Sequence, residues 1–338
     1  MRISENVSLR PYNTFGIAAQ ARFFSSFSNA MELEELLKAP QLKGLPHMIL
    51  GGGSNVLFTR NYEGGLLKNE MKGISVTGED DSSVYVKAGA GESWHGFVMD
   101  CIKHNRGGLE NLSLIPGNVG ASPMQNIGAY GVEIKDCFHE LEAYHLQDHT
   151  VVKFNNADCQ FGYRESVFKR QYKGRFAILS VTFRLSKSPK LNTSYGAIEE
   201  ELKQMGVQEP TIQAISQAVI NIRSSKLPDP AKIGNAGSFF KNPTVSAAKH
   251  NELKAAFPNI VAYPVAGGDF KLAAGWMIEQ CGWKGFREGD AGVHARQALV
   301  LVNYADASGN DIYDLSQRVL DSVAEKFGVE LEREVNII

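Results

Sequence analysis

Apolar positions along the chain follow two spacings, one typical of helices and one typical of strands. Between 93 and 106, for example, apolar residues recur every three or four positions, which predicts an amphipathic helix that Gly107 ends. Helical spacing occurs at 31–38, 93–106, 211–225, 246–257, 272–281 and 311–327. Strands are predicted at 47–50, 83–91, 138–146, 150–154, 176–185, 297–303 and 329–338. Because helices and strands are mixed rather than strictly alternating, the pattern favours an α+β fold over a doubly wound parallel sheet.

The final segment, VELEREVNII (329–338), alternates most regularly. One face of the expected strand carries Val329, Leu331, Arg333, Val335 and Ile337. The other face carries Glu330, Glu332, Glu334 and Asn336. Alternation alone does not separate the three glutamates, and a solvated strand face explains all of them equally well.

Composition and a proline-containing boundary segment indicate a multidomain globular protein. The two prolines of KLPDP (226–230) bar continuation of the preceding helix, so we expect the main domain boundary there. The 338 residues suffice for two or three domains, and 43% hydrophobic with 21% charged residues is typical of a soluble chain. A net charge of −2, without a block of Lys or Arg, gives no field that would favour nucleic acid.

Metal sites, disulfides and membrane segments are not expected. The four cysteines form no C-x-x-C pair, which suits a reducing cytosol, and the eight histidines show no metal-ligand spacing. The N-terminal stretch lacks the apolar region of a signal peptide, and no stretch approaches the roughly 20 apolar residues that span a bilayer. We therefore expect a cytoplasmic protein with no membrane partner.

Two glycine-rich segments are candidates for anion binding. LGGGSNVLF (50–58) follows a predicted strand, and its glycines let backbone N–H groups converge on an anion. It matches neither the dinucleotide fingerprint nor a P-loop, and a plain hairpin turn explains it as well. SLIPGNVGASPMQNIGAYGVEI (113–134) is long and aperiodic, which is typical of a functional or a disordered loop. Its interleaved apolar residues disfavour disorder, so the alternatives are a ligand-wrapping loop and a structural connection.

Eight motifs occur in one order along nearly the whole chain, from about residue 12 to 335. They are NTFGI (13–17), LGGGSNVLF (50–58), GLENLSLIPGNVGASPMQNIGAYGVEI (108–134), FGYRESVFK (161–169), KLPDP (226–230), NAGSFFKNP (235–243), KLAAGWMIEQCG (271–282) and HARQALVLVN (294–303). Together they resemble the UDP-N-acetylenolpyruvoylglucosamine reductases, flavoenzymes of peptidoglycan precursor synthesis.

The resemblance implies an α+β fold of the vanillyl-alcohol-oxidase type that binds FAD, followed by a substrate domain. The expected units are 1–68, joined by the strand 329–338; 69–225, with a tyrosine-bearing loop near 190–206; and 226–328. The two glycine segments become the cofactor cradle, for which the implied residues are Gly51, Gly52, Gly53, Ser54, Asn55, Ile115, Pro116, Gly117, Gly120, Ala121, Ser122, Pro123, Asn126 and Gly128. Since neither segment contains histidine, we expect noncovalent FAD.

The implied reaction is the NADPH-dependent reduction of an enolpyruvyl ether of UDP-N-acetylglucosamine to the lactyl ether, UDP-N-acetylmuramate. Arg164, in GYRES, would stabilise the enolate-like intermediate, because a guanidinium contacts a carboxylate with two prongs. Ser238 would give the proton, and Glu332 would stabilise the intermediate or relay a proton. Taken alone, these residues would equally suit a surface ion pair, a turn serine and a solvated strand face.

The remaining substrate contacts are implied in the same way. They are Tyr163, Tyr195, Lys226, Asn242 and Lys284, for which core packing or solvated surface positions are the alternatives. Tyr195 resembles the tyrosine of a subclass whose members tend to be monomeric, so we expect a monomer.

Three other functions are alternatives to this one. A serine hydrolase is disfavoured, because Ser238 lies in no G-x-S-x-G elbow and has no histidine in its motif. A flavin oxidase would share the glycine segments but has no need to keep Arg164, Ser238 and Glu332 together. A nucleotide-binding module would need the glycine segments but no proton donor.

Overall fold

The computed structural model describes residues 2–338, and the chain divides into two compact units. Unit 1 comprises the residues up to Val7, Ala21–Gly52 and Glu63–Ser225. Unit 2 comprises Ser8–Gln20, Gly53–Tyr62 and Lys226–Ile338. The main division therefore follows Ser225, just before KLPDP. Residues 8–20 and 53–62, expected within 1–68, group instead with the C-terminal part of the chain.

The first sheet of unit 1 has four strands, in the order β1 (Ser4–Ser8), β2 (Gln20–Phe27), β5 (Tyr62–Asn69) and β3 (His47–Leu50). Helix α1 (Ala30–Lys38) starts where the Asn29 side chain accepts a hydrogen bond from the N–H of Glu32. Its buried face carries Leu33 and Leu36, which pack with Phe27 of β2 in one apolar core. Parallel pairing of β3 with β5 places the end of β3, and the glycines that follow, at one edge of this sheet.

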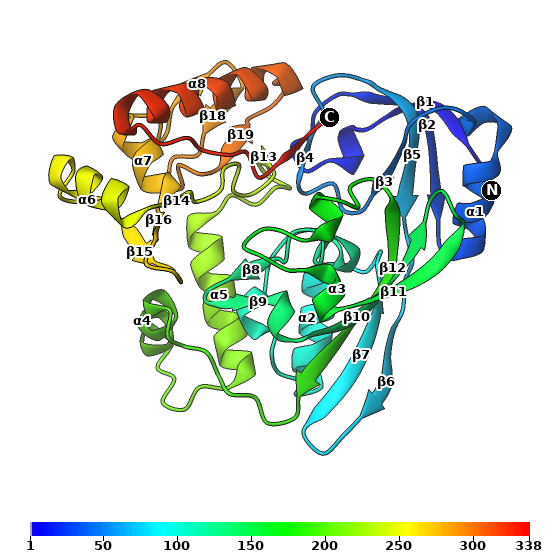
Figure 1. Ribbon diagram of the computed structural model, residues 1–338, viewed down its shortest axis with the longest axis horizontal. Coiled ribbons are helices and arrows are strands. Elements are labelled where there is room, and N and C mark those ends of the chain that lie inside the picture. The colour runs from blue at the N-terminus through cyan, green and yellow to red at the C-terminus, as the bar shows by residue number, and fades with distance from the viewer. Residues whose placement is uncertain (1) are drawn as a thin grey trace. The chain divides into compact units, whose positions relative to one another are not determined.

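The second sheet of unit 1 is antiparallel and has five strands (Figure 1). Their order is β11 (Thr150–Asn155), β10 (Phe138–His145), β12 (Phe176–Ser186), β7 (Ser83–Gly89) and β6 (Ile74–Glu79). Helix α2 (Trp94–Lys103) buries its predicted stripe in the same core, where the rings of Phe97 and Phe183 lie 5.2 Å apart. This core fixes the start of α2, which positions the site described below.

The rest of unit 1 is loop and short elements. The long loop carries β8 (Gly128–Ala129) and β9 (Val132–Glu133), and α3 (Asn156–Cys159) follows β11. Helices α4 (Gly196–Gln204) and α5 (Ile212–Lys226) share a small core that contains Ile198, Leu202 and Ile215.

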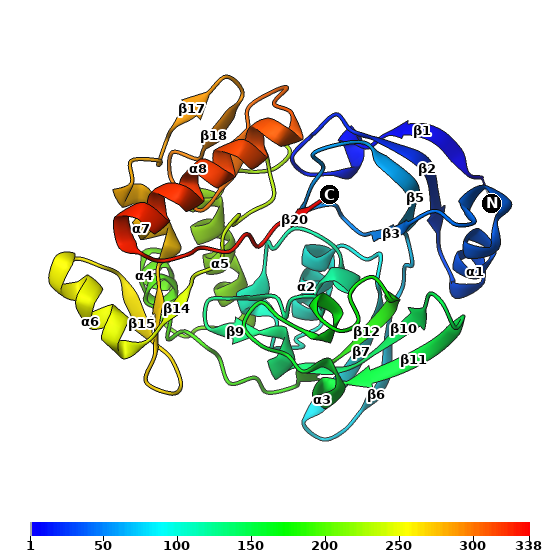
Figure 2. The same ribbon diagram turned by 45° about the horizontal axis from the view of Figure 1, so that its top comes forward.

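Unit 2 is built on a small antiparallel sheet in the order β13 (Gly234–Asn235), β19 (Leu301–Asn303), β18 (Ala291–Val293) and β17 (Arg287–Glu288). Helix α8 (Gly309–Phe327) lies along β18, as Figure 2 shows. Ser308 and Asp311 form a capping box at its start, and Gly328 ends it with a φ of 60°.

A second group in unit 2 contains the sheet β14 (Thr244–Val245), β16 (Phe270–Leu272) and β15 (Ala262–Pro264), with helices α6 (Ala247–Ala256) and α7 (Ala274–Gln280). Strand β20 (Asn336–Ile337) pairs in parallel with β4 (Val56–Leu57). Within residues 2–338, none of the helices is both long and apolar enough to cross a membrane.

The expected ten-residue strand at 329–338 is wrong in extent, because only Asn336–Ile337 forms a strand. Burial alternates through Arg333 and then fails, since Glu334 is buried although Glu332 before it is exposed. The cause is a local pairing with the segment 239–241: the N–H of Lys241 donates to the carbonyl of Glu332, and the N–H of Glu334 donates to that of Phe239. This pairing separates Glu332 from Glu334, which alternation alone did not.

Candidate functional site

The two glycine segments pack against each other in unit 1. A Cβ atom on Gly52 would lie 2.5 Å from Oδ1 of Asn118 and 3.0 Å from Cα of Gly117, so a larger residue there would require both to shift. A Cβ atom on Gly51 would lie 3.6 Å from its nearest neighbour, Cβ of Asn118, which is an ordinary contact distance. The two segments are therefore in close backbone contact at Gly52.

This junction presents backbone donors. Among residues 2–338, the N–H groups of Gly52, Ile115 and Gly117 donate to no other group of the chain. Pro116, between two of them, is exposed. Unpaired N–H groups on glycine-rich turns are suited to bind phosphate oxygens. The junction thus fits the pyrophosphate of a dinucleotide.

Backbone pairing with residues 90–94 holds the second segment in place. The N–H of Trp94 donates to the carbonyl of Gly117, and the N–H of Gly120 donates to the carbonyl of Ala90, each at 2.9 Å. Asn118 donates from Nδ2 to the carbonyl of Gly91 at 2.7 Å. A Cβ on Gly120 would lie 2.5 Å from that of Ala90, so close approach requires this glycine as well.

Of the cofactor residues that the resemblance implies, those from position 121 onwards interact mostly with other residues near the loop. The Ser122 hydroxyl donates to the carbonyl of Val119, and the Asn126 amide donates to Glu133 and to the carbonyl of Gly162. Pro123 is buried, whereas Ala121 is exposed and Gly128 lies in β8. The side-chain hydrogen bonds of Ser122 and Asn126 thus stabilise the loop that would line the cofactor site.

The cofactor residues implied at 53–55 begin the second segment of unit 2, Gly53–Tyr62. A Cβ on Gly53, which has a φ of 64°, would collide with the carbonyl oxygen of Tyr12. Ser54 is half-buried, and the Asn55 amide donates to the carbonyl of Glu334 at 3.3 Å. The glycine turn at 53 is thus required by packing against the chain near Tyr12.

Arg164 occupies a left-handed backbone conformation, with a φ of 53°. Its guanidinium carbon lies 5.7 Å from the ring centre of Tyr163, which is exposed. Gly162 and Glu165 pair across it, and the Asn126 bond to Gly162 joins this turn to the long loop. A non-glycine residue in this region of φ is held there by its surroundings, and such residues are common at active sites.

Tyr195 also lies beside the long loop. Its ring meets that of Tyr130 edge to face, with centres 5.2 Å apart. Asn192 donates to the carbonyl of Gly131, and Asn111 donates to the carbonyl of Asn192, so two hydrogen bonds hold the tyrosine-bearing segment. Tyr130 itself was missed by sequence reasoning, although the glycines on both sides of it in GAYG place it in the loop.

Ser238 and Glu332 both belong to unit 2. Ser238 is half-buried between Gly237, with a φ of 70°, and the fully buried Phe239. The Phe239 N–H donates to the carbonyl of Leu299, which fixes the turn. The two phenylalanines are therefore packing residues.

Lys241 holds the carboxylate of Glu332. Its Nζ lies 2.8 Å from Oε2 of Glu332, and the Glu332 side chain is 75% exposed while that of Lys241 is 19% exposed. Sequence reasoning missed Lys241, because the partner lies 91 positions away in the chain.

The three residues of unit 2 that the resemblance implies as nucleotide contacts differ in their hydrogen bonds and ion pairs. The side-chain oxygen of Asn242 accepts a hydrogen bond from the N–H of Ala274, so its amide N–H₂ is the part that would face a ligand. Lys284 pairs with Glu279 at 2.9 Å. Lys226 is exposed at the end of α5, and no ion pair forms at it within the described residues.

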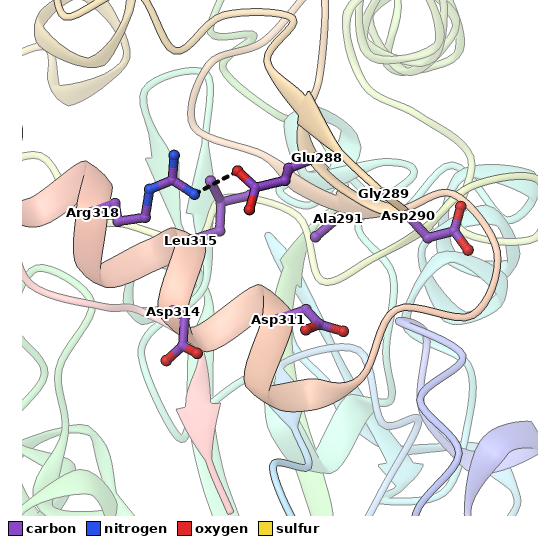
Figure 3. A pocket seen from close by; sticks show the side chains of 8 residues that line it. All are labelled: Glu288, Gly289, Asp290, Ala291, Asp311, Asp314, Leu315 and Arg318. Carbon is purple, nitrogen blue, oxygen red and sulfur yellow. Dashed lines mark hydrogen bonds and ion pairs between the residues drawn. The ribbon is translucent and has the colours of Figure 1, made fainter.

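A cavity of about 350 Å³ in unit 2 is lined by none of the predicted site residues (Figure 3). Its lining carries four carboxylates, those of Glu288, Asp290, Asp311 and Asp314, with Arg318 as the cation. Arg318 pairs with Glu288, and Asp311 caps α8. The excess of negative charge disfavours a diphosphate, and we do not assign this cavity to the functional site.

Comparison with known proteins shows which class of protein this chain belongs to. A model of an FAD-binding domain matches residues 23–155, which contain both glycine segments. A model of the C-terminal domain of UDP-N-acetylenolpyruvoylglucosamine reductase matches residues 229–338, which contain Ser238 and Glu332. The chain is a flavin-dependent oxidoreductase with an FAD-binding domain and a C-terminal domain.

Full-length relatives give the family. The chain is 50% identical over 337 residues to UDP-N-acetylenolpyruvoylglucosamine reductase of Pseudomonas syringae pv. tomato, covering 100% of this chain and 99% of the relative. It is 49% identical over 338 residues to the reductase of Amoebophilus asiaticus, covering 100% of both. The chain belongs to the UDP-N-acetylenolpyruvoylglucosamine reductase family.

Solved structures agree in fold. The reductase from Thermus caldophilus has a TM-score of 0.70 at 23% identity, covering 100% of this chain and 99% of that one. p-Cresol methylhydroxylase has a TM-score of 0.51 at 12% identity, covering 98% of this chain and 84% of that one. The α+β fold of the vanillyl-alcohol-oxidase type, implied by the family resemblance, is confirmed.

Proposed function

We propose that this protein uses FAD and NADPH to reduce UDP-N-acetylglucosamine enolpyruvate to UDP-N-acetylmuramate, a step of peptidoglycan precursor synthesis. The observation that carries the proposal is the junction of the two glycine segments, where unpaired N–H groups lie within the matched FAD-binding domain. Bound FAD supplies a hydride acceptor for NADPH and a hydride donor for the vinyl carbon of the substrate. With no histidine in either glycine segment, binding is noncovalent.

The chain's residues supply the charge and the proton that this reduction needs. Hydride addition to the terminal carbon leaves negative charge on the carbon next to the carboxylate. Arg164 is proposed to bind that carboxylate with its guanidinium and to stabilise the developing charge, because a preorganised cation costs no reorganisation during the reaction. One such donor typically contributes about 3–4 kcal/mol.

Ser238 is proposed to deliver a proton from its hydroxyl to the carbanion carbon. The positive φ of Gly237 and the hydrogen bond from the Phe239 N–H fix the backbone that carries this hydroxyl. Glu332, paired with Lys241, is proposed to stabilise the intermediate or to relay a proton. Tyr163, Tyr195, Lys226, Asn242 and Lys284 are proposed to hold the nucleotide part of the substrate.

Anaerobic spectroscopy tests the proposal. The purified protein is expected to be yellow, to bleach when NADPH is added, and to regain its colour when the enolpyruvyl nucleotide follows. If the colour fails to return although FAD is bound, the proposed substrate is wrong.

We further propose that the protein is a cytoplasmic monomer of the subclass that carries a tyrosine loop. Support comes from the exposed Tyr195 beside the loop containing Tyr130, and from the scattered thiols. Sedimentation analysis of the purified protein tests the monomer, for which a single species of 37.0 kDa is expected.

A further inference from the structure

Leu114 sits in a strained conformation immediately before the backbone donors of the second glycine segment. Its φ is 58°, the left-handed region that a leucine rarely adopts. The conformation therefore needs support from outside the loop.

Two side chains from different helices provide that support. The N–H of Leu114 donates to Nδ1 of His95 on α2 at 3.0 Å. The carbonyl of Leu114 accepts from Nε of Arg223 on α5 at 3.2 Å. Next to Leu114, the buried Ser113 hydroxyl lies 2.8 Å from that of Ser216, which also belongs to α5.

These two bonds determine where the N–H of Ile115 points. The carbonyl of Leu114 and the N–H of Ile115 belong to one trans peptide, so they point in opposite directions. The bond from Arg223 fixes one end of this peptide, and the bond to His95 fixes the peptide before it. Together they set both backbone angles of Leu114 and aim the N–H of Ile115 away from Arg223.

The chemistry of both side chains suits this role. Nδ1 of His95 accepts a hydrogen bond only when it carries no proton. Burial lowers the pKa of His95, and the charge of Arg223 lowers it further, which keeps the ring neutral. A charged donor at the carbonyl polarises the amide and makes its N–H a stronger donor to an anion.

We propose that His95 and Arg223 are positioning residues that clamp the Leu114 peptide and thereby present the N–H of Ile115 to the cofactor. The proposal rests on the assignment of the glycine segments to FAD. Without the clamp, the 114–115 peptide is free to rotate and Leu114 to relax to a right-handed conformation, which turns the donor away from the ligand.

Substitutions at His95 separate the hydrogen bond from the packing. His95→Leu removes the acceptor at similar volume, and we expect the FAD dissociation constant to rise about ten- to a hundredfold. His95→Asn places an oxygen near the position of Nδ1, and we expect it to recover most of that loss. His104→Leu, at the C-cap of the same helix and bonded to the Asp100 carbonyl, is the matched control and should bind FAD like the unchanged protein.

Arg223→Met tests the same peptide from the other side, and it carries the test if His95→Leu does not fold. We expect it to weaken FAD binding by a similar factor and to change the visible circular dichroism of the bound flavin. Because both side chains act on one residue, the double variant should bind little worse than either single variant.

The measurement is a fluorescence titration of the deflavinated protein with FAD, with thermal unfolding of the same samples as a check on folding. Equal binding by His95→Leu and the unchanged protein, fully additive losses in the double variant, or no recovery in His95→Asn would each overturn the clamp. Failure of the proposed function has a different signature, since the unchanged protein would then not regain colour with the enolpyruvyl nucleotide.

Discussion

Replacing Gly52 by alanine should weaken FAD binding, because the new methyl group would collide with the other glycine segment. Its Cβ would lie 2.5 Å from Oδ1 of Asn118 and 3.0 Å from Cα of Gly117, whereas ordinary contacts begin at about 3.4 Å. The Asn118 side chain yields only by losing its 2.7 Å hydrogen bond to Gly91, and the Gly117 backbone yields only by moving. The segments must therefore separate by roughly half an ångström to one ångström.

Overpacking of this kind costs about 1–3 kcal/mol. Because the displaced backbone carries the N–H groups proposed to bind pyrophosphate, the cost should appear in cofactor affinity, as a rise of about 5- to 150-fold in the FAD dissociation constant. The assay is fluorescence titration of the deflavinated protein, with calorimetric unfolding in parallel.

Gly51→Ala is the matched control. Its Cβ would meet Asn118 at 3.6 Å, which is ordinary contact, so we expect affinity within about threefold of the unchanged protein. Combining Asn118→Ala with Gly52→Ala removes the contact with the Asn118 side chain and should recover part of the lost affinity. The recovery should be incomplete, because the contact with Gly117 remains. If Gly52→Ala and Gly51→Ala bind FAD equally well, the two-segment cradle is refuted.

Three further predictions concern the reacting groups and pH. Ser238→Ala should leave bleaching by NADPH intact and slow the return of colour with the enolpyruvyl nucleotide, and an unchanged rate in stopped-flow absorbance would exclude the proposed proton donation. Arg164→Gln should lower kcat by about a hundred- to a thousandfold with FAD affinity unchanged. A change in KM alone would mean that Arg164 binds the substrate and the transition state equally well, and would contradict its proposed role. Burial lowers the pKa values of His47, His95 and His294, so as pH falls below about 6.5 the unfolded chain takes up protons that the folded chain does not. The free energy of unfolding should therefore decrease from pH 7 towards pH 5 in denaturant titrations, and a pH-independent value would contradict the buried neutral state of these rings.

The helices were predictable where a long amphipathic period coincides with clear end signals. The helix expected at 211–225 forms as Ile212–Lys226, because its apolar stripe has a small core to cover and KLPDP follows it. The strand expected at 329–338 forms only at Asn336–Ile337. The rest of the segment alternates because extended chain packs against the protein on one side, but no strand pairs with its backbone along the whole length. Local pattern thus predicts which face is buried better than it predicts which backbone partner is present.

The same distinction applies to the site. Glycine spacing and the family motifs identified the two glycine segments, since close backbone approach requires glycine itself. They did not identify His95 or Lys241, whose roles depend on partners brought near by folding: His95 bonds to a peptide 19 positions away, and Lys241 pairs with Glu332. Nor does any propensity place a leucine at a φ of 58°, because that conformation is held by tertiary hydrogen bonds.

Mass spectrometry of the product under anaerobic turnover is the sharpest test of whether the protein reduces the enolpyruvyl nucleotide. We expect one product molecule for each NADPH consumed, two hydrogens heavier than the substrate. Oxidation of NADPH in air to give hydrogen peroxide, with the enolpyruvyl nucleotide left unconverted both in air and anaerobically, would contradict it and would indicate a flavin oxidase on the same fold.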